Sequence, residues 1–454
     1  MGKELIFQTL RHEQTNEIPW VPFAGVHVGK LKGYTAEEVL RDEDKLVECL
    51  LEANKLYTPD GMPIIFDLQV EAEILGCDLM WAENNPPSVK SHPLSGEKSI
   101  PCNCKIPTPE SGRLPMILSA MRRVKAEIGD ETALYGLICG PFTLASHLRG
   151  TDIFMDMVSD SAYVKELVNY CSQVAIAMSQ MYIDAGMDVI AVVDPLVSQV
   201  SPKHIEKMLS EGFKAVFDFI RSKGVFSSFF VCGNATKQIE VMCKMGPDSV
   251  SVDENVNLAG AKETTDKYNI TIGGNIPLTT TMLHGTQEDN MKGVIDLIDS
   301  VDHHNLIVSP GCDMPYDTPI ENTIACAQAV KHPDSTRELI KNYEVVIDDS
   351  DVEIPDYENL DKVLIECFLL DPEQCAACTY MLASVEDNWD DLKDMADYRV
   401  YKYFIKEDIA RTRKMGIANL PTMCINGEQK FISIIPSKEE LIEAVKEAQA
   451  KMKK

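Results

Sequence analysis

Short apolar segments rich in β-branched and aromatic residues alternate with longer amphipathic segments from about residue 17 to about residue 330. The short segments predict strands, and they are GMPIIFD (61–67), ALYGLICG (133–140), MDVIAVVD (187–194), VFSSFFVC (225–232), SVSVDE (249–254), ITIGGN (270–275) and NLIVSPG (305–311). The longer ones, such as AYVKELVNYCSQVAIAMSQMYIDAG and PKHIEKMLSEGFKAVFDFIRSKG, predict helices. So many strand–helix units in about 300 residues favour an α/β fold of the (β/α)8 or TIM-barrel type, with a doubly wound open sheet as the alternative.

Polar and sulfur-containing residues stand at the C-terminal ends of these predicted strands. In a barrel, those ends surround the active site. The residues found there are Asp67, Asp194, Cys232, Glu254, Asn275 and Cys312. Because such side chains bind metals or move protons, they predict an active site at this end of the barrel.

An excess of acidic residues limits what the chain can bind. Lys and Arg number 43 against 71 Asp and Glu, which gives a net charge of −28 and a pI near 4.7. Such a field repels nucleic acid and anionic lipid, so we expect neither as a partner. The N-terminal segment lacks the apolar core of a signal peptide, and no uncharged apolar run reaches about 18 residues. We therefore expect a soluble, cytoplasmic protein whose cysteines are reduced.

The pattern changes after residue 335. Residues 336–360 are acidic and weakly periodic, which is typical of a linker between a first domain (1–335) and a second domain (361–454). The second domain begins with the predicted strand KVLIECFLL, followed by a CxxC motif at the start of a helix. The full order is β-α-β-α-β-β-α, with NLPTMCINGE leading into the third strand, and this arrangement resembles a thioredoxin-like domain.

The cysteines of this motif, Cys375 and Cys378, are candidates for a redox pair. A helix N-terminus stabilises a thiolate, so we expect Cys375 to attack and Cys378 to resolve the mixed disulfide. The resemblance implies that Pro421 is a cis proline facing the disulfide, with Thr422 beside it at the substrate-binding surface. Gln374 departs from the thioredoxin pattern, which has an aromatic residue there. A docking module without redox activity and a metal site on the two cysteines are the alternatives.

A family resemblance is carried by segments spread over the whole first domain. They are IPWVPFAGVHVGKLKG, DGMPIIFDLQVEAEILGCDLMW, GLICGPFTLASHLRG, GMDVIAVVDPLVSQVSP, FVCGNAT, DSVSVDENVNL and SPGCDMPYDTPIEN. In this order they resemble the uroporphyrinogen decarboxylase superfamily, and within it the methylcobamide-dependent methyltransferase branch. The resemblance implies a TIM barrel that moves a methyl group between a corrinoid, such as methylcobalamin, and a small-molecule acceptor. Because the chain has no Asp-x-His-x-x-Gly motif for cobalamin, we expect the corrinoid on a separate partner protein.

The resemblance also implies a zinc site, in which a His-x-Cys pair and a distant cysteine hold the metal and the metal binds the incoming thiol as a thiolate. Cys232 matches the first cysteine and Cys312 the second, but Phe230 stands at the histidine position. A phenyl ring cannot ligate a metal, so a third ligand must come from elsewhere. The candidates for that ligand are Glu254, Asp194 and His27.

Three interpretations of this site stay open at the level of sequence. In the first, Cys232, Cys312 and a relocated ligand bind zinc, which activates a thiol acceptor. In the second, zinc is lost and the acceptor is tetrahydrofolate, whose N5 needs acid–base positioning instead. In the third, the two cysteines are a redox or nucleophilic pair served by the CxxC motif. The polar candidates around the acceptor are Asp67, Asp194, Asn234 and Glu254.

Two other functions are compatible with parts of the chain. Asp67 matches the catalytic aspartate of uroporphyrinogen decarboxylase, but VPFAGVHVGKLKG has none of the arginines that would hold an octa-anionic substrate. A thiol redox or accessory protein, in which Cys375 and Cys378 carry the only chemistry, is the rival from another class. The sequence favours a corrinoid-dependent methyltransferase fused to a dithiol redox domain, which would either keep the reactive thiols of the barrel reduced or deliver electrons during turnover.

Overall fold

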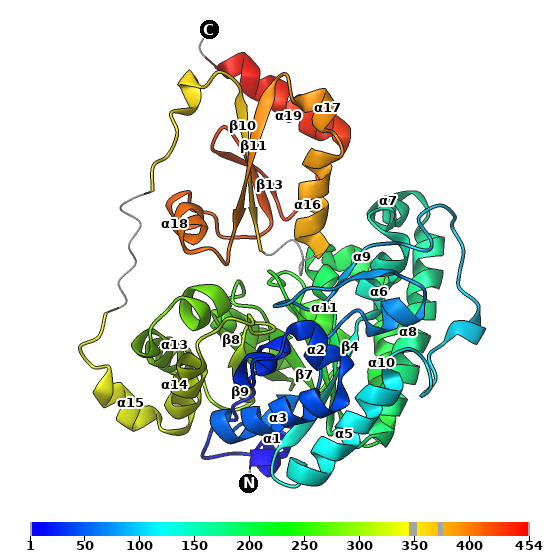
Figure 1. The fold of residues 1–454 in the computed structure, drawn as a ribbon, viewed down its shortest axis with the longest axis vertical. Coiled ribbons are helices and arrows are strands. Elements are labelled where there is room, and N and C mark those ends of the chain that lie inside the picture. The colour runs from blue at the N-terminus through cyan, green and yellow to red at the C-terminus, as the bar shows by residue number, and fades with distance from the viewer. Residues whose placement is uncertain (1, 345–351, 371–375, 453–454) are drawn as a thin grey trace. The chain divides into compact units, whose positions relative to one another are not determined.

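The chain divides into two compact units, residues 1–343 and residues 344–454. The computed structural model in Figure 1 describes residues 2–344, 352–370 and 376–452. The first unit extends beyond the expected boundary at 335 because its last helix and the turn after it pack on α13 (Gln287–Asp299). Arg337 forms an ion pair with Asp299 at 2.6 Å, and the Tyr343 hydroxyl donates to Asp289 at 2.9 Å.

The first unit is built on a curled, fully parallel sheet of the order β1-β4-β5-β6-β7-β8-β9. Its strands are β1 (Gly61–Pro63), β4 (Ala133–Cys139), β5 (Val189–Val193), β6 (Phe226–Val231), β7 (Ser249–Val252), β8 (Thr271–Ile276) and β9 (Leu306–Pro310). Each lies within a segment that the sequence predicts as a strand, except that β8 ends one residue later, at Ile276. A short stretch around Trp20 joins the two edges, because Val21 N donates to Val308 O at 3.0 Å and Asp60 N donates to Trp20 O at 2.9 Å. The sheet is therefore TIM-barrel-like.

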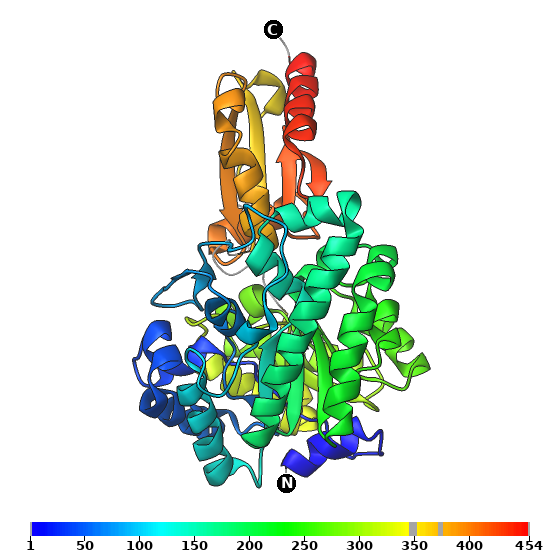
Figure 2. The same cartoon turned by 90° about the vertical axis from the view of Figure 1, so that its right-hand side faces the viewer.

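Helices surround this sheet. In sequence order they are α1 (Gly2–Leu10), α2 (Ala36–Arg41), α3 (Glu43–Tyr57), α4 (Val70–Ile74), α5 (Leu114–Ile128), α6 (Pro141–Arg149), α7 (Asp152–Ser159), α8 (Ser161–Asp184), α9 (Pro202–Met208), α10 (Ser210–Ser222), α11 (Ile239–Lys244), α12 (Leu258–Lys267), α13, α14 (Ile320–Lys331) and α15 (Pro333–Leu339). Amphipathic spacing explains their packing: α10 buries Phe213, Val216, Phe217 and Ile220, one helical face. Figure 2 shows α8 and α10 running along the outside of the sheet.

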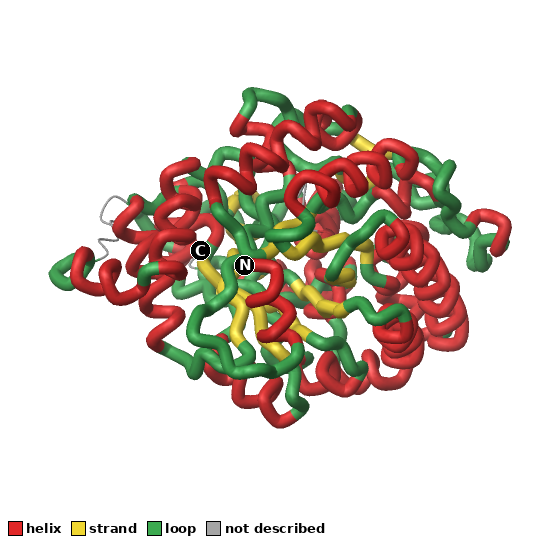
Figure 3. Tube along the Cα trace, turned by 90° about the horizontal axis from the view of Figure 1, so that it is seen from below, coloured by secondary structure: helices red, strands yellow, loops and turns green. Residues whose placement is uncertain are grey.

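The two ends of the barrel differ. At the N-terminal ends of the strands, α1 lies across the opening and inserts Ile6 and Leu10 into the core (Figure 3). The opposite end, which we call the mouth, is formed by the loops that follow the seven strands. An aromatic cluster fills the barrel interior, and its members are Phe23, Phe66, Tyr135 and Phe230.

The second unit is a four-stranded sheet of the order β11-β10-β12-β13, in which only β10 and β11 run parallel. Its elements are β10 (Val363–Leu369), α16 (Ala376–Glu386), α17 (Trp389–Leu392), β11 (Ala396–Lys402), α18 (Lys406–Lys414), β12 (Thr422–Ile425), β13 (Glu428–Ile432) and α19 (Lys438–Lys451). Apart from the short α17, this is the order that the sequence predicts. Figure 1 shows α16 and α19 on one face of the sheet and α18 on the other.

Alternation along the central strand β10 explains these two layers. Ile365 and Cys367 point into the apolar core under α16 and α19. Glu366 points to the opposite face, where its carboxylate pairs with Arg411 of α18 at 2.6 Å and accepts the Tyr357 hydroxyl at 2.7 Å. In the part of the chain that the structure describes, no helix is long and apolar enough to cross a membrane.

Candidate functional site

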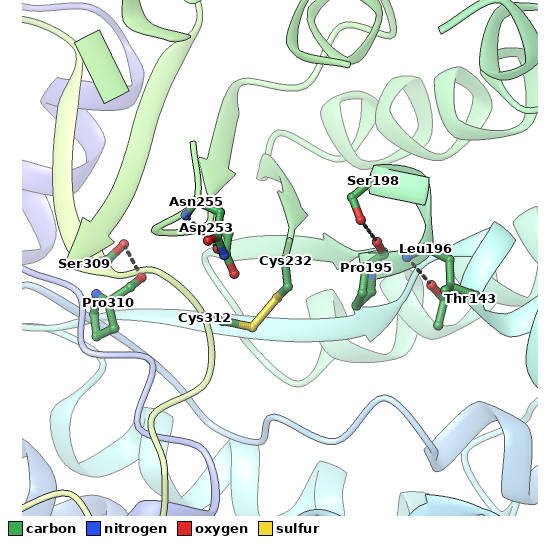
Figure 4. The surroundings of a disulfide bond; sticks show 10 residues. All are labelled: Thr143, Pro195, Leu196, Ser198, Cys232, Asp253, Asn255, Ser309, Pro310 and Cys312. Carbon is green, nitrogen blue, oxygen red and sulfur yellow. Dashed lines mark hydrogen bonds between the residues drawn. A yellow bond between two sulfur atoms is a disulfide. The ribbon is translucent and has the colours of Figure 1, made fainter. Parts of the chain in front are cut away.

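A disulfide joins two loops of the barrel mouth. Cys232 directly follows β6 and Cys312 lies two residues after β9, and their Cα atoms are 5.9 Å apart (Figure 4). Two strands, β7 and β8, lie between them in the sheet, so the bond spans the mouth between non-adjacent strands. The sequence predicts both cysteines as metal-binding thiolates, whereas here their sulfur atoms are bonded to each other.

Phe230 is part of the barrel core. Its side chain is 0 % exposed, and its ring centroid lies 4.8 Å from that of Phe23 and 5.9 Å from that of Phe66. Because side chains two apart on a strand share a face, Cys232 stands above Phe230. Both Cys232 and Cys312 pack against this aromatic cluster. The position that the resemblance assigns to a histidine ligand therefore supplies apolar packing.

His27 is not available as a metal ligand, in contrast to the sequence hypothesis. It is fully buried, with Nδ1 2.9 Å from Tyr316 O and Nε2 2.7 Å from the Tyr57 hydroxyl. Both ring nitrogens are thus engaged within the fold. Burial lowers the pKa of His27 to about 4, so the ring is neutral and serves as a hydrogen-bonded core residue.

Asp194 holds the start of α6. One carboxylate oxygen accepts the Phe142 N–H at 2.8 Å, and the other accepts the Thr143 hydroxyl at 2.6 Å. Burial raises the pKa of Asp194 to about 6, although the hydrogen bonds from Thr143 and Phe142 oppose this rise. Asp194 fixes the loop after β5 to the loop after β4, so both of its oxygens are engaged within the fold and do not supply the third metal ligand for which it was a candidate.

The loop after β7 carries two carboxylates beside the disulfide. Glu254, half-buried, accepts the backbone N–H of Leu278. Asp253 is buried, and its Oδ1 accepts the backbone N–H of Asn255 at 2.8 Å (Figure 4). Burial raises the pKa of Asp253. Glu254 was predicted from the sequence and Asp253 was missed. The signal was present, because side chains alternate along SVSVDE, so Asp253 and Glu254 point to opposite faces and only one of them was considered.

Two asparagines at the mouth stabilise loops. Asn234 accepts the Thr236 hydroxyl at 2.7 Å, which closes the turn after Cys232. Asn275 donates to the carbonyl oxygens of Asp253 at 2.9 Å and Val256 at 2.8 Å. Both residues position the backbone around the disulfide.

A second group of charged residues lies in the loop after β1 and in α4. Asp67 Oδ2 is 2.7 Å from Arg113 Nη2, and Asp67 Oδ1 accepts the Gln69 N–H at 2.9 Å. Glu71 is 1 % exposed; its Oε1 accepts the Cys139 N–H at 2.9 Å, while its Oε2 has no hydrogen-bond partner. Burial raises the pKa of Glu71 to about 7. Glu71 lies in α4, one helical turn beyond Asp67, so the pattern of polar residues at strand ends does not reveal it.

The donor atoms do not fit the zinc site that the resemblance implies. The two sulfurs are bonded to each other, and Phe230 has no donor atom. The polar atoms of Asp194 and His27 form hydrogen bonds within the fold. No group of three or more His, Cys, Asp or Glu side chains placed to hold a metal occurs within residues 2–344, 352–370 and 376–452. The hypothesis of a relocated zinc ligand is therefore not supported by this arrangement.

In the second unit, Cys378 is 0 % exposed near the start of α16, while Cys375 lies outside the described residues. Thr422 is buried and donates its hydroxyl to Asn419 O at 2.6 Å. The peptide bond between Leu420 and Pro421 is cis.

Comparison with known proteins assigns the first unit. The family model described as uroporphyrinogen decarboxylase (URO-D) matches residues 1–333. The chain belongs to this family. The relatives and the solved structure described next match the chain at low sequence identity.

Relatives of two kinds match the chain. The methylcobamide:CoM methyltransferase MtbA of Methanosarcina acetivorans is 26 % identical over 339 residues, covering 73 % of this chain and 98 % of that protein. The uroporphyrinogen decarboxylase of Wolbachia sp. subsp. Brugia malayi is 28 % identical over 302 residues, covering 65 % of this chain and 83 % of that protein. A solved methyltransferase from Methanosarcina mazei aligns with a TM-score of 0.65 at 22 % identity, covering 72 % of this chain and 98 % of that chain, and this supports the fold.

Proposed function

We propose that the chain is a corrinoid-dependent methyltransferase that moves a methyl group between a corrinoid carried by a partner protein and a small acceptor. The observation that carries the proposal is the match to a methylcobamide:CoM methyltransferase over 98 % of that protein's length. The position of Cys232 and Cys312 at the mouth supports it, because barrel enzymes act at the C-terminal ends of their strands.

In the forward direction, the acceptor attacks the methyl carbon of the corrinoid substrate, and the electron pair of the carbon–cobalt bond stays with cobalt. The chain's part is to position the acceptor and to hold or release its proton. Glu71 suits the second task, because a carboxyl with a pKa of about 7 exchanges a proton near neutral pH. The neighbouring carboxylate, Asp67, forms an ion pair with Arg113.

The altered cysteine site bears on which acceptors should be tested. A thiol acceptor gains from a Lewis acid, and the donor atoms at Cys232, Cys312 and Phe230 do not provide a zinc site. Tetrahydrofolate is a neutral nitrogen nucleophile that needs only acid–base positioning. We therefore place tetrahydrofolate beside thiols as the acceptors to test first.

We further propose that the second unit is a thioredoxin-like dithiol domain. The β11-β10-β12-β13 sheet order and the CxxC sequence support this proposal. Complete burial suits Cys378 to the resolving role, with Cys375 as the attacking thiol. In this proposal, Pro421 with its cis peptide bond and Thr422 face the CxxC pair, as the resemblance implies.

The decisive assay follows the absorbance of methylcobalamin after addition of coenzyme M or tetrahydrofolate. We expect demethylation with one acceptor, and we expect it to survive in the Cys375→Ser, Cys378→Ser double variant. Disulfide reduction that the double variant abolishes, without methyl loss from any acceptor, would make the chain a redox accessory protein. Conversion of uroporphyrinogen would instead identify a decarboxylase.

A further inference from the structure

We propose that Cys232 and Cys312 form a thiol–disulfide exchange site in the barrel, whose substrates are dithiols. This site takes the place of the zinc centre that the family resemblance implies. It is distinct from methyl transfer and does not depend on the proposed methyltransferase activity. The first observation behind it is the bond itself, which joins the end of β6 to the loop after β9 (Figure 4).

The surroundings favour paired sulfurs over metal-bound thiolates. The apolar side of the site is formed by Phe230, which packs on Phe23 at 4.8 Å and lies with both cysteines in one core cluster. A neutral disulfide or a pair of thiols is compatible with an aromatic bed, whereas a zinc ion held there by the two thiolates alone would lack the third protein ligand that catalytic zinc sites use. The substitution of an aromatic ring for a nitrogen donor thus changes the chemistry that the site can support.

Access distinguishes this pair from most other cysteines of the first unit. Cys232 and Cys312 are half-buried at the mouth, so part of the site is reachable from solvent. Cysteines within the core of that unit, such as Cys139 and Cys171, are fully buried. A disulfide placed at the end of a barrel where reactive groups gather, and not sealed within the core, is suited to exchange.

The exchange balances without any further reagent. One thiolate of the dithiol attacks Cys232 or Cys312, the sulfur–sulfur bond breaks, and a mixed disulfide forms. The released cysteine thiolate takes a proton. The second thiol of the substrate then attacks the mixed disulfide, so the substrate leaves as a disulfide and both cysteines become thiols. Two electrons and two protons pass from the dithiol to the barrel.

The test is a redox titration of the full chain with mixtures of reduced and oxidised dithiothreitol. After acid quenching, cysteines are alkylated in denaturant, and peptides are analysed by mass spectrometry. We expect Cys232 and Cys312 to change together and reversibly between bonded and alkylated forms, with the circular dichroism of the folded chain unchanged. Cys139 and Cys171 should be alkylated at every ratio and serve as internal controls. A bond that dithiothreitol opens only when the chain unfolds would overturn the proposal and make it a structural cross-link.

Two further measurements address the remaining alternatives. In Cys232→Ser, the remaining Cys312 should form a mixed disulfide when the folded protein meets 5,5′-dithiobis(2-nitrobenzoate), whereas Cys139→Ser, a control variant, should keep the wild-type pattern at Cys232 and Cys312. Absence of the Cys312 adduct contradicts the exchange site. Reduced wild-type protein dialysed against zinc should retain no stoichiometric metal. About one zinc for each chain, lost in Cys232→Ser, would instead establish a metal centre.

Discussion

Replacement of Glu71 by glutamine should stabilise the first unit, and only at neutral and alkaline pH. The Glu71 carboxyl is 1 % exposed, and burial raises its pKa from 4.5 to about 7. For an acid with a raised pKa, the folded state holds the proton more tightly, so the free energy of unfolding falls as pH rises from 4.5 to about 7. At about 1.4 kcal/mol for each tenfold change in proton affinity, the loss amounts to about 3 kcal/mol above that range.

Glutamine imitates the protonated form of Glu71. Its carbonyl oxygen can still accept the Cys139 N–H, and its amide group replaces the Oε2 that has no partner in the wild type. Glu71→Gln should therefore match the wild type to within about 1 kcal/mol near pH 5 and exceed it by about 3 kcal/mol near pH 8.5. With an unfolding entropy of about 0.7 kcal/mol/K for residues 1–343, the gain of about 3 kcal/mol near pH 8.5 corresponds to a rise of about 4–5 °C in Tm.

Differential scanning calorimetry of the full chain at both pH values measures this difference. Glu127→Gln is the matched control, because Glu127 is an exposed glutamate on α5. Its Tm should equal that of the wild type at both pH values. An equal effect of Glu71→Gln at both pH values, or a lower Tm near pH 8.5, would refute the reasoning. Either result would mean that a charged Glu71 is compensated within the fold, for example by Arg113.

Three further predictions concern other parts of the chain. Phe230→Ala removes the ring beneath the disulfide and should lower the unfolding free energy of the first unit by about 3–5 kcal/mol in calorimetry; a change below about 1 kcal/mol would show that the cluster collapses around the gap. Asp194→Ala leaves the Phe142 N–H and the Thr143 hydroxyl at the start of α6 without their acceptor and should cost about 1–3 kcal/mol, read by urea denaturation, and a neutral result would contradict the capping role. Glu366→Gln weakens the buried pair with Arg411 and should destabilise only the second unit, by up to about 3–5 kcal/mol, whereas the exposed control Glu443→Gln should leave both calorimetric transitions in place.

Local sequence patterns were sufficient to predict most of the secondary structure and the order of its elements. The strands that end near Cys139, Asp194 and Cys232 were predictable, because a short run of β-branched and aromatic residues bounded by turns is typical of a strand and of few other structures. For the same reason, the element order of the second unit followed from periodicity apart from α17. Phe230, visible in the sequence, already showed that the family's zinc set was incomplete.

Only the tertiary structure decided what each polar side chain touches. In the sequence, His27 and Asp194 are candidates for a metal ligand. In the structure, both ring nitrogens of His27 and both carboxylate oxygens of Asp194 form hydrogen bonds within the fold. Cys232 and Cys312 are 80 residues apart, so their bond depends on the curvature of the sheet, and Glu71 acquired its pKa from burial by distant strands. Secondary structure is set by neighbours along the chain, whereas burial and hydrogen-bond partners are set by neighbours in space, and the sequence specifies those only through the completed fold.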